Sequence, residues 1–222
     1  MTTKKNSTEE EPETTEPQAT KKSGGGGAVA AAQKILADES PQSKIAEHGE
    51  TMMEGPRTAA TQSARVLSEI IDVKPELVVP LVAKFAKGIS SPNKRVVQTS
   101  AEALPAIARI APARVARQLD VLKSSFEEAN EVGKDGLVRT FAALCTASVA
   151  YQKRLEPVLT LALNGADGKT LFAWSQIVLP ALKGEPHARA RAVVEGRLDL
   201  IPRSYAQQIA DFLGIKLRIR YR

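Results

Sequence analysis

Residues 75–111 read PELVVPLVAKFAKGISSPNKRVVQTSAEALPAIARIA, and this stretch decides the fold class. Its apolar residues recur at spacings of three and four, as in Val78, Leu81, Phe85 and Ile89, which is the period of an α-helix. Residues that end helices stand at its limits and in its middle: Lys74-Pro75, Gly88 with Ser91-Pro92, and Ala111-Pro112. The stretch therefore predicts two helices joined by a short turn.

The same pattern extends from this stretch in both directions. Towards the N-terminus, Ala60, Ala64, Leu67 and Ile71 keep the helical period. Towards the C-terminus, helix breakers continue at regular intervals: Gly133 with Gly136, Gly165, Gly184 with Pro186, Pro202 and Gly214. No convincing strand pattern precedes residue 215. The sequence therefore predicts an all-α chain of about nine helices of roughly 11 to 19 residues over residues 56–214.

Related segments recur along the chain. Pro80-Leu81-Val82 has a counterpart in Pro157-Val158-Leu159, and Leu104-Pro105-Ala106-Ile107 has one in Leu179-Pro180-Ala181-Leu182. The two separations are similar, and half of each is about 38 residues, enough for two helices. One helical hairpin cannot bury its own apolar face and must stack on the next. The sequence therefore predicts a helical-hairpin repeat.

The unit at residues 75–111 has a Pro inside its first helix, a short turn, and a second helix with a small-then-large pattern; the residues are Pro80, Ser90 to Asn93, Arg95-Val96, Ala101, Ala103 and Leu104. These features resemble a HEAT repeat, although residues 88–93 lack the Asp that is customary in that family. Residues 112–149 and 151–183 match more loosely, with a terminal unit at 186–213 and a degenerate first unit at 56–71. The resemblance implies an α-solenoid of about four HEAT-like helical hairpins, with second helices lining its concave surface.

Composition divides the chain into four parts. Residues 1–27 hold only two hydrophobic residues, so we expect a disordered tail with an acidic patch flanked by lysines. Residues 28–55 are expected to be a weakly structured linker that includes a short Ala-rich helix at most, and residues 56–214 the α-solenoid. Residues 215–222 alternate apolar and basic side chains, which is the period of a strand. For this basic tail, disorder, packing across the last unit, and addition to a partner's sheet edge or nucleic-acid backbone stay open.

The side chains offer little for catalysis or metal binding. One Cys and two His exclude an internal disulfide and leave little for a zinc site. No GxGxxG, GK[ST], HExxH, GxSxG or CxxC motif occurs. We expect Cys145 to be a buried structural thiol, His48 and His187 to be solvated, and Trp174 to make a core or inter-repeat contact. The expectation is a non-enzymatic, cytoplasmic protein without cofactor or metal, since it also lacks an apolar signal core and any apolar run of about 20 residues.

Charge is the feature that indicates function. Residues 56–222 carry 25 Lys and Arg against 15 Asp and Glu, and within them residues 183–222 carry nine against four. Basic clusters attract acidic protein surfaces or phosphates, although a solubilising surface is the plain alternative. The expected partner-binding residues are Lys94, Arg95, Arg109, Lys134, Arg139, Lys169, Arg189, Arg191, Lys216, Arg218, Arg220 and Arg222.

The first functional hypothesis is therefore a non-enzymatic scaffold that engages an acidic macromolecule, with a protein preferred as the partner. The alternative is nucleic-acid binding through the phosphate backbone without sequence readout. Some HEAT-like repeat proteins resemble DNA glycosylases of alkylation repair, but no residues here match a glycosylase site motif, so the resemblance implies no catalysis. An enzyme with an unrecognised site is the third class.

Overall fold

A computed structural model of the chain describes residues 26–217, and every regular element in this range is a helix. The α-helices are α1 (Gly26–Leu36), α2 (Gln42–Glu54), α3 (Arg57–Val73), α4 (Val82–Gly88), α5 (Lys94–Ile110), α6 (Pro112–Ala116), α7 (Leu119–Glu128), α8 (Glu131–Ala147), α9 (Val149–Gly165), α10 (Gly168–Ala181), α11 (Gly184–Arg197) and α12 (Arg203–Leu213). Two 3-10 helices, η1 (Pro75–Leu81) and η2 (Leu198–Leu200), complete the described part. The all-α prediction is confirmed for these residues.

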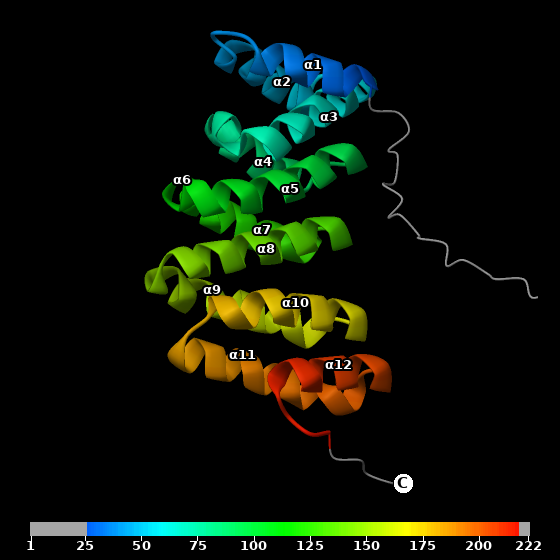
Figure 1. Cartoon of the computed structure of the whole chain (residues 1–222), viewed down its shortest axis with the longest axis vertical. Helices are drawn as coiled ribbons and strands as arrows, with labels where there is room; N and C mark the ends of the chain where they lie inside the picture. The colour runs from blue at the N-terminus through cyan, green and yellow to red at the C-terminus, as the bar shows by residue number, and fades with distance from the viewer. Residues whose placement is uncertain (1–25, 218–222) are drawn as a thin grey trace, which may run out of the picture.

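The helices stack in layers that follow the chain from one end of the molecule to the other (Figure 1). α3 contacts α5, α5 contacts α8, α8 contacts α10 and α10 contacts α12, so these five helices form one continuous row. We call them the second helices and their exposed side the second-helix face. The first helices are α2, η1 with α4, α6 with α7, α9, and α11, and α1 packs on α3 at the N-terminal end of the stack.

The second helices begin at a constant interval. The starts of α3, α5, α8 and α10 follow one another every 37 residues, at Arg57, Lys94, Glu131 and Gly168. The residues before the last three starts, Asn93, Asn130 and Asp167, accept hydrogen bonds from backbone amides at 3.0, 2.9 and 2.7 Å. Such N-caps satisfy amides that have no partner inside the helix. The repeat predicted at about 38 residues is therefore 37 residues long in this row.

The core repeats with the same interval. Leu67, Leu104, Phe141 and Val178 stand 37 residues apart on α3, α5, α8 and α10, and all four are fully buried. Each therefore fills the same place in successive layers. Burial of one such side chain stabilises the fold by about 1.5–3 kcal/mol.

Gly136 marks the closest contact between two second helices. A Cβ atom added there would lie 2.4 Å from the Cβ and 2.5 Å from the Cα of Ala101 on α5. Pro105 has no amide hydrogen to donate to the Ala101 carbonyl, and Gly136 lies against that carbonyl. The absence of a side chain at Gly136 is thus what allows α8 to lie directly on α5.

Residues 28–55 form two helices, which differs from the expected linker. α1 and α2 both pack on α3, and their buried residues are Ala28, Ala32 and Ile35 on α1 and Ile45, Gly49 and Met52 on α2. Gly49 is part of this stripe because the side chain of Leu81 packs directly against it. A Cβ atom at position 49 would lie 2.8 Å from Leu81 Cδ2. Three of these six buried residues are Ala or Gly, which gives a weak apolar period, so the sequence pattern did not predict two packed helices here. The expected disordered tail lies outside the described residues, apart from Gly26 and Gly27 at the start of α1.

Two of the expected first helices are broken. Residues 75–88 form η1 and then α4, with the change of helix type next to Pro80, and residues 112–128 form α6 and then α7. In the first of these, Pro80 removes one backbone hydrogen bond and crowds the preceding turn. No helix within residues 26–217 is long and apolar enough to cross a membrane.

Candidate functional site

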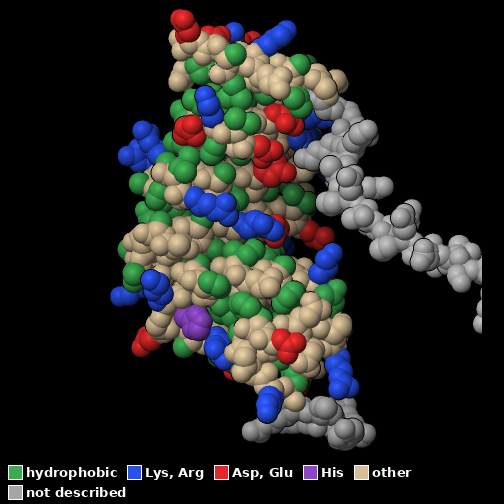
Figure 2. Space-filling model, in the orientation of Figure 1, with side chains coloured by type: hydrophobic (Ala, Val, Ile, Leu, Met, Phe, Trp, Pro, Cys, Tyr) green, Lys and Arg blue, Asp and Glu red, His purple; other side chains and the backbone are tan. Residues whose placement is uncertain are grey.

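Six of the basic residues expected to bind a partner lie on the second helices, whereas Arg189 and Arg191 lie on the first helix α11. α5 carries Lys94, Arg95 and Arg109, α8 carries Lys134 and Arg139, and α10 carries Lys169. In the view of Figure 2, Lys and Arg side chains are interspersed with Asp and Glu side chains. The structure gathers four of the six basic residues around two hollows, one on either side of α8.

The first hollow, which we call the α5–α8 hollow, has a volume of about 570 Å³. Arg109 and Arg139 both line it, together with the carboxylates of Glu102 and Asp135. Arg109 is exposed and has no hydrogen-bond or ion-pair partner among residues 26–217. The Nε of Arg139 donates to Oδ2 of Asp135 at 2.6 Å. The hollow therefore brings together two guanidinium groups from adjacent layers, one of them free.

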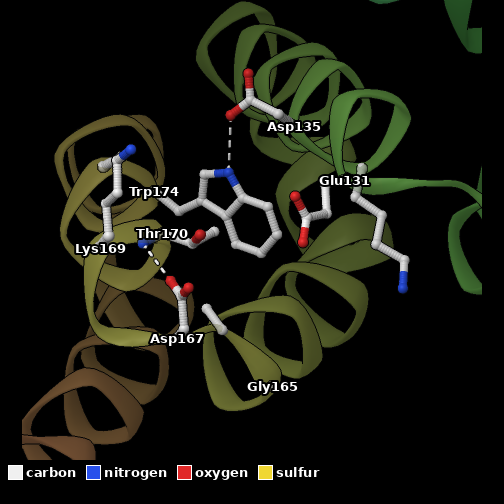
Figure 3. Close-up of a pocket in the computed structure, with 10 residues that line it drawn as sticks. Glu131, Asp135, Gly165, Asp167, Lys169, Thr170 and Trp174 are labelled. Atoms are coloured by element: carbon white, nitrogen blue, oxygen red, sulfur yellow. Dashed lines mark hydrogen bonds between the residues drawn. The ribbon is translucent and has the colours of Figure 1, made fainter. Parts of the chain in front are cut away.

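The second hollow lies between α8 and α10, with a volume of about 560 Å³ (Figure 3), and we call it the α8–α10 hollow. The indole of Trp174 lies in it and donates from Nε1 to Oδ1 of Asp135 at 2.9 Å. The expected inter-repeat contact of Trp174 is thereby confirmed. Since indole N–H groups seek an acceptor when they are buried, this bond fixes the ring between the two layers.

The charges around the α8–α10 hollow are mixed. Lys134 and Lys169 line it, but so do the carboxylates of Glu131 and Asp167. Oδ1 of Asp167 accepts the amide of Thr170 at the start of α10, and this hydrogen bond lowers the pKa of the Asp167 carboxyl. A carboxylate that caps a helix in this way stays ionised at neutral pH. The α8–α10 hollow is therefore not a purely basic surface.

Asp135 lines both hollows, and the sequence did not identify it. It joins Arg139 on its own helix to Trp174 on the next layer. A lone carboxylate on a helix is usually read as solvated. The available signal was spacing, because Asp135 precedes Trp174 by close to one repeat length.

Besides Arg139, three of the expected partner-binding residues make side-chain contacts within the chain. Arg189 on α11 donates from Nε and one terminal nitrogen to the two carboxylate oxygens of Glu156 on α9, at 3.1 and 3.2 Å. Arg191 donates to Glu195 at 2.7 Å and to the carbonyl oxygen of Leu213. Arg95 donates from a terminal nitrogen to Oε1 of Gln98 at 3.2 Å. The contacts of Arg189 and Arg191 join different parts of the chain, whereas the Arg95 contact stays on one helix.

The Glu156 contact was not predicted either. Glu156 is only 8% exposed, so its carboxylate needs a partner inside the fold. Arg189 supplies that partner, and Oε1 of Glu156 also accepts the hydroxyl of Thr160 at 3.1 Å. The two first helices are thus joined by a bidentate ion pair.

The basic tail begins as part of the last layer. α12 ends at Gly214, whose φ of +67° suits glycine, and the amide of Ile215 donates back to the Ala210 carbonyl at 3.0 Å. Ile215 and Leu217 pack against the core while Lys216 is exposed. Packing across the last unit therefore holds for residues 215–217. Arg218, Arg220 and Arg222 lie outside the described residues.

The groups considered for catalysis are placed in the core or beside it. Cys145 is fully buried, as expected, and burial raises the pKa of its thiol to about 12. His48 differs from the expected solvated residue: it is half-buried, its Nδ1 lies 3.1 Å from the Ser63 hydroxyl, and burial lowers its pKa. The described residues include no group of three or more His, Cys, Asp or Glu side chains placed to hold a metal ion.

The candidate site is thus the pair of open hollows that share Asp135 on the second-helix face. Comparisons of the chain with protein-family models, with curated proteins and with solved structures give no match.

Proposed function

We propose that this chain is a non-enzymatic binding scaffold, a HEAT-like α-solenoid whose second-helix face engages an acidic macromolecule, with a protein as the preferred partner. The observation that carries the proposal is that four basic residues on three consecutive second helices have no ion pair in the described part of the chain: Lys94, Arg109, Lys134 and Lys169. Stacked helical units present an extended surface, which suits a macromolecular partner.

The partner's charge follows from the residues that remain free. Arg189 and Arg191 are paired with carboxylates of the chain, whereas Arg109 and Lys169 are exposed and unpaired among residues 26–217. The excess of Lys and Arg in residues 56–222 adds a long-range field that draws acidic partners. An acidic partner would supply the missing counter-charges.

Neutralising this face is expected to weaken binding of an acidic polypeptide about tenfold. The variant replaces Lys94, Arg109, Lys134 and Lys169 by Gln. Exposed ion pairs contribute about 0.2–1 kcal/mol each, so four together reach about the 1.4 kcal/mol of a tenfold change. Fluorescence anisotropy with labelled poly-L-glutamate measures the affinity, and a duplex DNA is measured beside it.

The matched control removes the same charges from the first helices and their connections. It replaces three Lys and one Arg by Gln, at Lys87, Arg117, Lys123 and Lys153, all exposed and without a partner in the described part of the chain. The proposal expects affinity within about twofold of the original chain. Equal losses in the two variants would mean that net charge alone attracts the probe. Tight binding of the duplex alone would replace the acidic protein by nucleic acid.

Removing residues 218–222 is expected to leave the melting temperature unchanged and to weaken poly-L-glutamate binding severalfold. The deletion takes away Arg218, Arg220 and Arg222 but keeps Ile215 and Leu217, which pack on the last layer. The salt dependence of binding should also become shallower, because fewer ion contacts form. Affinity and circular dichroism melting at three ionic strengths check both points. A lower melting temperature with unchanged affinity would make these residues structural.

A further inference from the structure

The α5–α8 hollow has spare hydrogen-bond donors, whereas its acceptors are engaged. Both oxygens of Glu102 already accept, from Gln98 at 3.0 Å and from Ser68 at 2.8 Å. Both oxygens of Asp135 also accept, from Arg139 at 2.6 Å and from Trp174 at 2.9 Å. Each carboxylate oxygen in this hollow therefore already accepts one hydrogen bond before a ligand enters.

The donors are different. Within the described residues Arg109 donates to nothing, and Arg139 uses only its Nε. A guanidinium has five N–H donors in a planar fork that matches the two oxygens of a carboxylate. The two arginines come from adjacent layers of the stack and line the same hollow. The unused hydrogen-bond donors of the hollow therefore suit carboxylate-like acceptors.

Apart from Gln98, the rest of the lining is apolar. Ala101, Pro105 and Ala106 of α5 face the hollow, and Val132 of α8 lines it with 50% of its surface exposed. A hydrophobic side chain at the edge of a polar hollow gains from being covered by a small apolar group. The hollow therefore combines sites for negative charge with a site for an apolar side chain.

We infer that the α5–α8 hollow binds an acidic peptide segment of a partner protein, whose carboxylates contact Arg109 and Arg139 and whose small apolar side chain covers Val132. This inference rests on the proposed function and deepens it by choosing a protein over nucleic acid. A peptide can alternate acidic and apolar side chains. A phosphate backbone carries a charge at every nucleotide, so it would meet the fixed carboxylates of Glu102 and Asp135 and leave Val132 uncovered.

The test uses the full chain and a labelled peptide, GEEVEEG, with GEESEEG and GQQVQQG as its matched forms. Arg109→Gln and Val132→Ser are each expected to weaken GEEVEEG binding by about fivefold or more. Arg109→Lys keeps the charge but not the planar fork and is expected to weaken binding about threefold. Lys153→Gln and Leu161→Ser are the controls, one basic and one apolar, both exposed and on α9, and are expected to change affinity less than about twofold.

A double-mutant cycle shows whether the peptide's Val covers Val132. The loss caused by Val132→Ser should be present with GEEVEEG and nearly absent with GEESEEG, because the cycle isolates the contact between the two side chains. GQQVQQG should bind at least tenfold more weakly than GEEVEEG. Equal effects of Val132→Ser on both acidic peptides would overturn the assignment of the apolar site.

Other occupants give distinct results, each of which overturns the inference. Displacement of the peptide by duplex DNA, with the same sensitivity to Arg109→Gln, would assign the hollow to nucleic acid. Binding seen only after removal of residues 1–25 would make the chain's own acidic segment the occupant. A dimer lost in Arg109→Gln would make it a second copy. If the four-residue variant weakens poly-L-glutamate binding but Arg109→Gln leaves the affinity for GEEVEEG unchanged, the inference fails and the proposed function stands. If poly-L-glutamate does not bind to the chain at all, both fail.

Discussion

Leu104→Asp is expected to lower the free energy of unfolding by about 4 kcal/mol or more. Leu104 is fully buried in the middle of α5, at the position that Leu67, Phe141 and Val178 fill in the neighbouring layers. The substitution removes an apolar side chain from the core and leaves a carboxylate there without a partner. Since about 1 kcal/mol shifts the melting temperature of a domain of this size by about 2–4 °C, the midpoint should fall by roughly 10 °C or more.

Leu161→Asp is the matched control, because it makes the same chemical change at a leucine that is 57% exposed on α9. Its effect is expected to stay within about 0.5 kcal/mol, as for most surface substitutions. Melting curves by circular dichroism compare the two variants. Similar midpoints for Leu104→Asp and the original chain would show that α5 does not bury this face.

Gly136→Ala is expected to destabilise the chain by about 1–3 kcal/mol, although Ala forms helices better than Gly. The new methyl group would lie 2.4 Å from the Cβ of Ala101, so α5 and α8 would have to separate. Overpacking of this kind destabilises the fold by more than the higher helix propensity of Ala stabilises it. Chemical denaturation measures the free energy of unfolding.

The opposite sign is expected for Gly196→Ala. Gly196 lies in α11, and an added Cβ there meets no atom within 4 Å. Only the helix propensity then changes, which favours Ala by about 0.5–1 kcal/mol. Opposite changes in the free energy of unfolding for the same substitution at the two sites would locate the close helix contact at Gly136. A gain of stability at both sites would contradict the described packing of α5 on α8.

The all-α class and the repeat could be predicted because large apolar residues carry the period. Leu67, Leu104, Phe141 and Val178 recur every 37 residues in the core, and turn residues separate the helices between them. α2 could not be predicted in the same way. Its buried stripe contains Gly49, which Leu81 covers from another helix, so the information lies in a contact distant in sequence.

The candidate site could be predicted only in part. The helical period and the positions of the basic residues predicted that these residues lie on the second helices, and Arg109 and Arg139 do line one hollow. It could not show which charges are neutralised, because Arg189 meets a buried Glu156 that precedes it by 33 residues. Asp135 was missed for the same reason, since Trp174 reaches it from the next layer. Pairing between layers depends on packing, which composition and spacing do not specify.

The most direct test of the central claim is to find which lysines an acidic polypeptide touches. A carbodiimide joins carboxylates of bound poly-L-glutamate to lysines in contact with them, and mass spectrometry identifies the modified sites. The second helices carry Lys94, Lys134 and Lys169, and the first helices carry Lys87, Lys123 and Lys153 as an internal control. We expect cross-links at the first three, suppressed at high salt because the contacts are ionic. Cross-links at Lys87, Lys123 and Lys153 in equal or greater yield would contradict binding at the second-helix face.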